Sequence, residues 1–153
     1  MRRFLAGLVA GAALALPAVA FSGSGGSSNG AACVFTTQLR AANETTGSTS
    51  TATRHTQIKI RNDGTLEFKT QIENPDAETF IAGHVHRAPA GVAGPVVVPL
   101  FGGTTTTDRH IRNDGATAID PALAADICAN PAGYYVNYHT TAFPGGAIRG
   151  QLG

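Results

Sequence analysis

Hydrophobic and polar residues alternate in short runs along most of the chain, and glycine, proline and asparagine gather between these runs. Such alternation is typical of β-strands that bury one face. The pattern predicts strands at residues 33–40, 53–61, 65–73, 79–86, 95–101, 107–112, 115–119, 133–139 and 146–152. It also predicts one short helix that follows Pro121, with Asp120 as its N-cap. About eight or nine strands without long helical segments indicate an antiparallel β-sandwich or barrel.

The run from residue 53 to residue 73 is the clearest hairpin, because two alternating segments flank Asn-Asp-Gly at 62–64. A two-residue loop would pair Ile60 with Glu67 and so place a charge on the apolar face. A three-residue loop that ends in a left-handed glycine pairs Ile60 with Leu66 and Lys59 with Glu67 instead. The three-residue loop is therefore predicted.

The first twenty residues lack this alternation. Two arginines precede an apolar run that ends in Ala18-x-Ala20, which is the pattern of a cleaved signal peptide. The run is too short to span a bilayer of about 30 Å comfortably. We therefore expect a signal peptide at 1–20, a flexible Gly/Ser linker at 21–31 and one folded domain at 32–153. The mature protein is expected to be secreted or periplasmic, without a transmembrane helix.

Charge and cysteine content narrow the possible partners. Removal of Arg2 and Arg3 from the eleven Lys/Arg leaves nine against ten Asp/Glu. The sequence shows no basic run, so neither nucleic acid nor a membrane surface is an expected partner. The expected partner is therefore an unknown protein or polymer outside the cytoplasm. In an exported chain, Cys33 and Cys128 are expected to form one disulfide.

Histidine supplies the only concentrated chemistry. His84 and His86 project to the same side of a strand because side chains alternate in direction. His139 and Asn137 share a face of a second predicted strand. If the two strands are neighbours, three imidazoles converge, and Asn137 can orient one of them from behind. Three imidazoles with an open position suit copper or zinc. Histidines on a solvent-facing strand are also ordinary, so spacing alone leaves both interpretations open.

Two longer motifs carry a family resemblance. The segments "AGHVHRAPAGVAGPVVVPLF" and "GYYVNYHTTAFPGGAIRGQL" resemble the CHRD (chordin-type) domain, here in the form of a single-domain exported bacterial protein. The resemblance extends over about residues 33–152. It implies an immunoglobulin-like, all-β Greek-key sandwich of about eight strands outside the cytoplasm.

The same residues are distantly similar to the copper/zinc superoxide dismutases. Those enzymes carry a His-Val-His on one strand, a later copper-binding histidine and an arginine near the C-terminus that attracts superoxide. His84, His86, His139 and Arg149 occur here in that order. The resemblance implies that Arg149 would steer an anion toward a metal ion.

Two functions follow as hypotheses. The first is a non-enzymatic CHRD module with a binding or adhesion role, without catalytic residues, whose docking patch would include Phe101, Tyr135 and Phe143. The second is a mononuclear copper or zinc protein that uses the three histidines. Only in a dismutase-like form of the second hypothesis would the protein be an enzyme, with Arg149 as its catalytic residue.

Overall fold

The computed structural model describes residues 30–153. The predicted signal peptide and most of the predicted linker lie outside the described residues. The strands are β1 (Ala31–Arg40), β2 (Thr53–Arg61), β3 (Thr65–Glu73), β4 (Phe80–Arg87), β5 (Val96–Phe101), β6 (His110–Ala118), β7 (Tyr134–Thr140) and β8 (Ile148–Gln151). One α-helix, α1 (Pro121–Ala129), and two single-turn 3-10 helices, η1 (Ala41–Asn43) and η2 (Pro131–Gly133), complete the secondary structure of this part of the chain.

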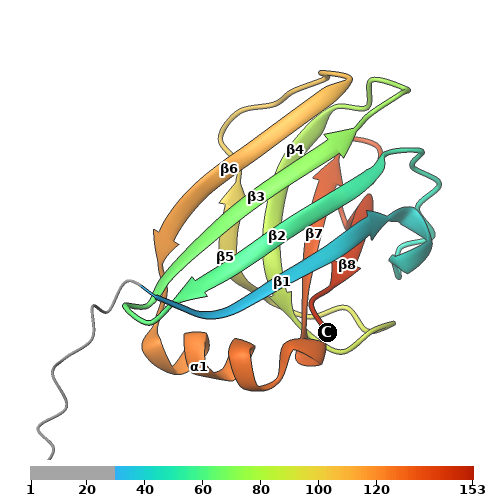
Figure 1. Ribbon diagram of the computed structural model, residues 1–153. Helices are drawn as coiled ribbons and strands as arrows, with labels where there is room; N and C mark the ends of the chain where they lie inside the picture. The colour runs from blue at the N-terminus through green and yellow to red at the C-terminus, as the bar shows by residue number, and fades with distance from the viewer. Residues whose placement is uncertain (1–29) are drawn as a thin grey trace, which may run out of the picture.

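All eight strands belong to one antiparallel sheet, in the order β5-β4-β7-β8-β1-β2-β3-β6. The sheet curls so that its two ends approach each other, with β6, β3, β2 and β1 on one side and β5, β4, β7 and β8 on the other (Figure 1). The Asn113 side chain on β6 donates to the carbonyl of Leu100 on β5. The predicted all-β fold with eight antiparallel strands is confirmed, in the form of a nearly closed, sandwich-like barrel.

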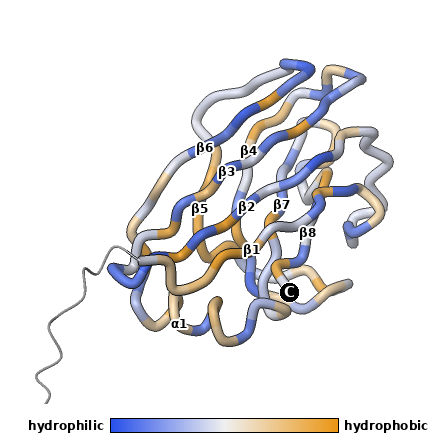
Figure 2. Tube along the Cα trace, in the orientation of Figure 1, coloured by the Kyte–Doolittle hydropathy of each residue, from blue (hydrophilic) through white to orange (hydrophobic). Residues whose placement is uncertain are grey.

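The core lies between the two sides of the curled sheet. Hydrophobic and hydrophilic residues alternate along the strands in Figure 2, as one-sided burial requires. Helix α1 runs across one end of the barrel, and its Ile127 is fully buried. As predicted, Asp120 caps this helix by accepting from two backbone N–H groups. The predicted disulfide between Cys33 and Cys128 is present and joins β1 to the helix.

The β2–β3 hairpin has the predicted register. Ile60 pairs with Leu66, and Lys59 pairs with Glu67. Gly64 has a φ of +81°, the left-handed conformation that the three-residue loop needs. The buried face of the hairpin thus decided its loop length.

The prediction of separate strands at 107–112 and 115–119 is wrong, because β6 runs without interruption from His110 to Ala118. Asp114-Gly115 reads as a turn but lies in the middle of this strand. Gly115 is opposite Phe68 on β3, and a Cβ atom at Gly115 would approach Cζ of Phe68 to 2.6 Å. This glycine makes room for an aromatic ring.

Strand β7 is buried along its whole length. One of its faces contacts the core, and two connections cover the other: residues 41–52, between β1 and β2, and residues 88–95, between β4 and β5. Asn43 donates to the carbonyl of Arg149, and Thr46 donates to the carbonyl of Gly146. The polar residues on the outer face of β4, β7 and β8 therefore lie in a semi-enclosed layer. Within residues 30–153, no helix is long and apolar enough to cross a membrane.

Candidate metal centre

The three histidines predicted as ligands lie together on the outer face of β4 and β7. These strands are neighbours, with His84 opposite Asn137 and Ala82 opposite His139. The side chains of His84 and His139 are therefore diagonal neighbours on one face, and His86 follows two residues along β4. The sheet register, which pairs segments about fifty residues apart in the chain, creates the cluster.

One nitrogen from each ring lies within 4.8 Å of one nitrogen from each of the others. The shortest separation, between Nδ1 of His84 and Nε2 of His139, is 3.1 Å. Two nitrogens bound to one tetrahedral ion at about 2.0–2.1 Å lie about 3.3 Å apart. The His84–His139 pair has nearly this spacing, and His86 needs a shift of the order of 1 Å to complete a shared site.

Backbone carbonyls fix the tautomers of two of the rings. Nδ1 of His86 is 2.9 Å from the carbonyl oxygen of Gly94, and Nδ1 of His139 is 3.0 Å from that of Pro144. Because a carbonyl only accepts, both Nδ1 atoms carry hydrogen, and both Nε2 atoms present a lone pair. Nε2 of His86 is buried without a hydrogen-bond partner. A buried acceptor without a partner, close to two other imidazoles, fits the role of a metal-ligating nitrogen.

His84 completes the set. Since Nε2 of His139 is an acceptor, Nδ1–H of His84 donates to it across 3.1 Å. An ion held here would take the place of that hydrogen, and neutral His84 would then carry its proton on Nε2. The ligand atoms that fit are therefore Nδ1 of His84 and Nε2 of His86 and His139.

The environment keeps all three rings neutral. Burial, with the neighbouring His139 and His86, lowers the pKa of His84 from its usual 6.5 to about 4. Burial also lowers the pKa of His86 and of His139, although their carbonyl partners oppose the shift. Metal ligation requires the neutral imidazole. The site therefore offers three uncharged nitrogens at neutral pH.

Tyr135 and Arg149 support the cluster from behind. The Tyr135 ring stacks on His86, with centroids 4.9 Å apart and planes 12° apart. Cζ of Arg149 lies 3.3 Å from the Tyr135 centroid. Because β4 and β8 flank β7 on opposite sides, the imidazole and the guanidinium lie on the two faces of the phenol ring. Cation–π attraction and stacking thus hold His86 in place.

Arg149, predicted to steer anions in a dismutase-like site, is only 1% exposed. Its guanidinium donates to the carbonyls of Val92 and Pro89 and to the side chain of Gln151. These bonds pin the 88–95 connection, which also carries the carbonyl acceptor of His86. In this geometry Arg149 positions the loop that orients a ligand.

Asn137, predicted to orient an imidazole, lies between His84 and Arg149 in the register and is 2% exposed. Its Oδ1 has no hydrogen-bond partner. The carboxyl of Glu44 lies close to the Asn137 side chain, since both lie against Gly146. A Cβ atom added to this glycine would come within 3 Å of each of the two side chains. Burial raises the pKa of Glu44 to about 7, although Arg149 opposes the shift.

Glu44 does not stand out in the sequence. It lies among threonine, serine and glycine residues in a connection without periodicity, and no motif distinguishes it. Only the fold of residues 41–52 over β8 brings it to the cluster. Sequence reasoning also missed Gly94, whose carbonyl fixes the His86 tautomer.

The other two histidines do not join the cluster. His55 on β2 and His110 on β6 lie on the outer face of the opposite side of the barrel. The predicted docking patch of Phe101, Tyr135 and Phe143 is wrong. Tyr135 is buried by its stacking partners, and within residues 30–153 the exposed large hydrophobic residues are valines at 34, 92 and 96.

The comparison with protein families gives one result. The model of the CHRD domain matches residues 35–152, which is most of the chain. The chain therefore belongs to the CHRD domain family. No curated protein and no solved structure matches the chain. The similarity to copper/zinc superoxide dismutases stays a prediction.

Proposed function

We propose that this chain is a CHRD module that acts outside the cytoplasm and binds one copper or zinc ion through His84, His86 and His139. The buried, unpartnered Nε2 of His86, directed toward two other imidazoles, carries the proposal. The location is inferred from the apolar N-terminal segment and is supported by the disulfide.

The donor set defines the class of ion. Three neutral imidazole nitrogens suit zinc and copper better than the hard cations calcium and magnesium, which take oxygen ligands. Three protein ligands leave a further position, through which such an ion can bind a small molecule. The carbonyls of Gly94 and Pro144 orient two of the ligands, as is usual for metal-bound histidines.

The proposal does not include dismutase activity. The Arg149 donors that would attract an anion are used by carbonyls and by Gln151, and Tyr135 lies between the guanidinium and His86. A binding role thus agrees better with the geometry than catalysis does.

The test is calorimetric titration of the mature protein with Zn²⁺ and with Cu²⁺, combined with elemental analysis. We expect one ion per chain and a higher unfolding temperature with metal. The variant His84→Ala/His86→Ala should lose both effects. The matched control, His55→Ala/His110→Ala, removes two histidines on the opposite side and should keep both. Equal binding by the wild type and the His84/His86 variant would contradict the proposal.

A further inference from the structure

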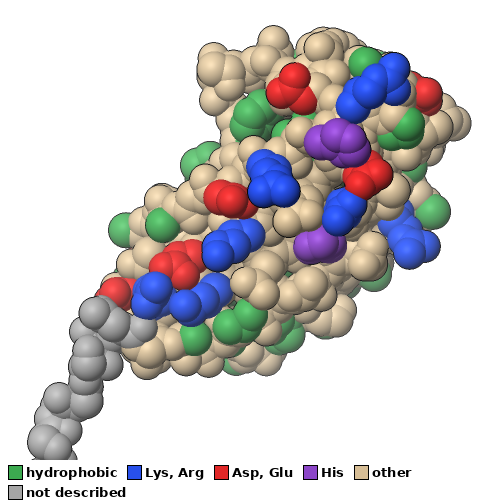
Figure 3. Space-filling view, turned by 45° about the horizontal axis from the view of Figure 1, so that its top comes forward, with side chains coloured by type: hydrophobic (Ala, Val, Ile, Leu, Met, Phe, Trp, Pro, Cys, Tyr) green, Lys and Arg blue, Asp and Glu red, His purple; other side chains and the backbone are tan. Residues whose placement is uncertain are grey.

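The outer face of β1, β2, β3 and β6 collects most of the cationic side chains. Of the nine Lys/Arg in residues 30–153, six lie on these four strands: Arg40, Arg54, Lys59, Arg61, Lys69 and Arg112. Three acidic residues accompany them on the strands: Glu67, Glu73 and Asp114. Figure 3 shows this face, with Lys/Arg, Asp/Glu and histidine side chains spread across it. The nearly neutral sequence gives no sign of this concentration, because the remaining acidic residues lie elsewhere.

The strand register orders this face into rows. One row crosses all four strands and consists of Gln38, His55, Gln71 and Arg112. It contains no carboxylate, and its four side chains all carry hydrogen-bond donors or can carry them. With strands about 4.8 Å apart, the row extends over about 14 Å. The face therefore offers a continuous line of donors that runs across the strands.

The cations on this face differ in their pairing. Lys59 and Arg61 form ion pairs with Glu67, and Arg54 forms one with Glu73. Lys69 and Arg112 form no ion pair with any described residue and are exposed. They lie on neighbouring strands, because Lys69 is opposite Asp114, two residues from Arg112. Their charges are available to a ligand.

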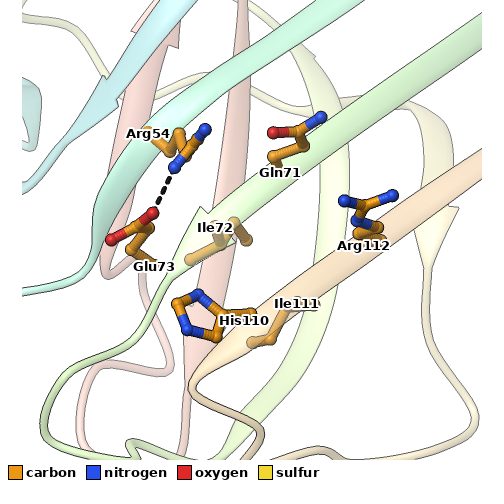
Figure 4. A pocket seen from close by; sticks show the side chains of 7 residues that line it. All are labelled: Arg54, Gln71, Ile72, Glu73, His110, Ile111 and Arg112. Atoms are coloured by element: carbon orange, nitrogen blue, oxygen red, sulfur yellow. Dashed lines mark hydrogen bonds and ion pairs between the residues drawn. The ribbon is translucent and has the colours of Figure 1, made fainter.

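A shallow hollow lies at this end of the row, and its lining includes Arg54, Gln71, Glu73, His110 and Arg112. Figure 4 shows the Gln71 amide and the Arg112 guanidinium on one side and the Arg54–Glu73 pair on the other. Because Arg54 forms an ion pair with Glu73, the Arg112 guanidinium supplies the unpaired charge of this hollow.

We propose that this face binds a linear anionic polysaccharide, laid across the strands along the Gln38–Arg112 row. An acidic group of the polymer sits in the hollow at Arg112, and Lys69 contacts the next part of the chain. The amides of Gln38 and Gln71 then bond to sugar hydroxyls. This surface lies on the opposite side of the barrel from the three histidines, so it does not depend on the metal centre.

The composition of the face favours a sugar polymer over a nucleic acid. The row has no Phe, Tyr or Trp ring, and the single imidazole of His55 is its only aromatic ring for base stacking. A polysaccharide needs no run of stacking rings, and its hydroxyls match the amides of Gln38 and Gln71 in the row.

The test compares two variants with the same change in charge. Lys69→Gln/Arg112→Gln removes the two unpaired cations of β3 and β6, and Arg61→Gln/Arg87→Gln removes two ion-paired ones. Binding to dextran sulfate, polygalacturonate, neutral dextran and oligothymidylate is measured at about 50 mM salt, and thermal unfolding checks that each variant folds. We expect the wild type to bind at least one acidic polysaccharide, more weakly as salt rises. The Lys69/Arg112 variant should bind roughly fivefold more weakly, and the control about as the wild type does.

Preference between dextran sulfate and polygalacturonate identifies the acidic group, and either preference supports the proposal. Four results overturn it: no binding of acidic polysaccharide, equal binding of neutral dextran, oligothymidylate binding as tight as that of the polysaccharide, or equal losses in the two variants. The metal titration uses different residues, so failure of one proposal leaves the other intact.

Discussion

Single atoms determine what the histidine cluster can bind. The lone pair of His86 faces the other rings because its second nitrogen is held by the Gly94 carbonyl. Gly94 in turn donates its N–H to the hydroxyl of Tyr135. There is no room for a side chain at this position, since a Cβ atom would lie 2.0 Å from the Arg87 carbonyl oxygen. Gly94 thus connects the 88–95 loop, the Tyr135 hydroxyl and the His86 imidazole.

Gly94→Ala should therefore weaken metal binding. The added methyl group displaces the loop, the His86 hydrogen bond is lost, and affinity falls roughly 10- to 100-fold, as for other residues that orient ligands. The measurement is zinc titration by calorimetry, with thermal unfolding as a check on the fold. The control is Gly102→Ala, where a Cβ atom meets nothing within 4 Å. Equal affinities in the two variants would show that the carbonyl does not position His86.

Glu44 makes stability depend on pH. Its pKa is raised from 4.5 to about 7, so the folded state keeps a proton that the unfolded state loses. Wild-type stability should fall as pH rises from about 4.5 to about 7. Glu44→Gln removes this dependence. The free energy of unfolding of the variant, taken relative to that of wild type, should be about 1–2 kcal/mol higher at pH 8 than at pH 4. This range allows for solvent screening of a half-buried group.

The measurement is urea unfolding of both proteins between pH 4 and pH 8. A constant difference between them would mean that the Glu44 carboxyl titrates normally.

The secondary structure elements show which parts of the fold the pattern of residues predicts. The β2–β3 register follows from apolar residues on one face and from one charged pair on the other. The helix follows from Asp120 and Pro121. The break predicted in β6 is wrong because a glycine can serve either a turn or close packing, and only the position of the Phe68 ring distinguishes the two. Local patterns therefore predict the strands and the helix well, except where a side chain distant in sequence determines whether a glycine forms a turn or packs within a strand.

The disulfide acts at this scale, because it joins the first strand to a helix that lies 95 residues further along the chain. Closing so long a loop restricts the unfolded chain, so Cys33→Ala/Cys128→Ala should lose roughly 2–4 kcal/mol of stability. The check is chemical unfolding of this variant and of the oxidised wild type. Metal affinity should hardly change, since neither cysteine lies on β4 or β7. A large loss of metal affinity would mean that the barrel end and the histidine cluster are coupled.

In the whole molecule, the closure of the barrel depends on a few contacts between the ends of the sheet. Asn113 on β6 donates both to the Leu100 carbonyl on β5 and to the Tyr138 hydroxyl on β7. Phe80 and Thr106 exchange two backbone hydrogen bonds nearby. Strands β5 and β6 form no backbone hydrogen-bond ladder with each other, so the Asn113 side chain inside the barrel links them instead.

Asn113→Ala should loosen this closure. Two hydrogen bonds are lost, and the Tyr138 hydroxyl is left without its donor in the interior, which costs roughly 2 kcal/mol. Hydrogen exchange of β5 amides should increase more than that of β2 amides. Asp114→Ala, the next residue on the outer face, is the control and should leave both quantities nearly unchanged. Uniform exchange rates across the sheet would show that Asn113 does not hold the two ends together.

The candidate sites depend on this global arrangement to different degrees. The histidines could be predicted from the sequence because the spacing of His84 and His86 is local, and the motif around His139 made its strand a plausible neighbour. Glu44 and the loop-pinning role of Arg149 could not, since both depend on how the connections fold over the sheet. The same is true of the Gln38–Arg112 row, whose members come from four strands.

The joined ends of the sheet also protect the protein from self-assembly. An exposed outer strand is a template for aggregation, because its unpaired backbone groups can recruit another chain. Here β5 and β6 face one another, and Pro99 removes one N–H donor from β5. Growth of amyloid-like fibrils from the native state would first have to separate these two strands. The hydrogen bond from Asn113 to the Leu100 carbonyl, which helps to close the barrel, therefore also opposes polymerisation.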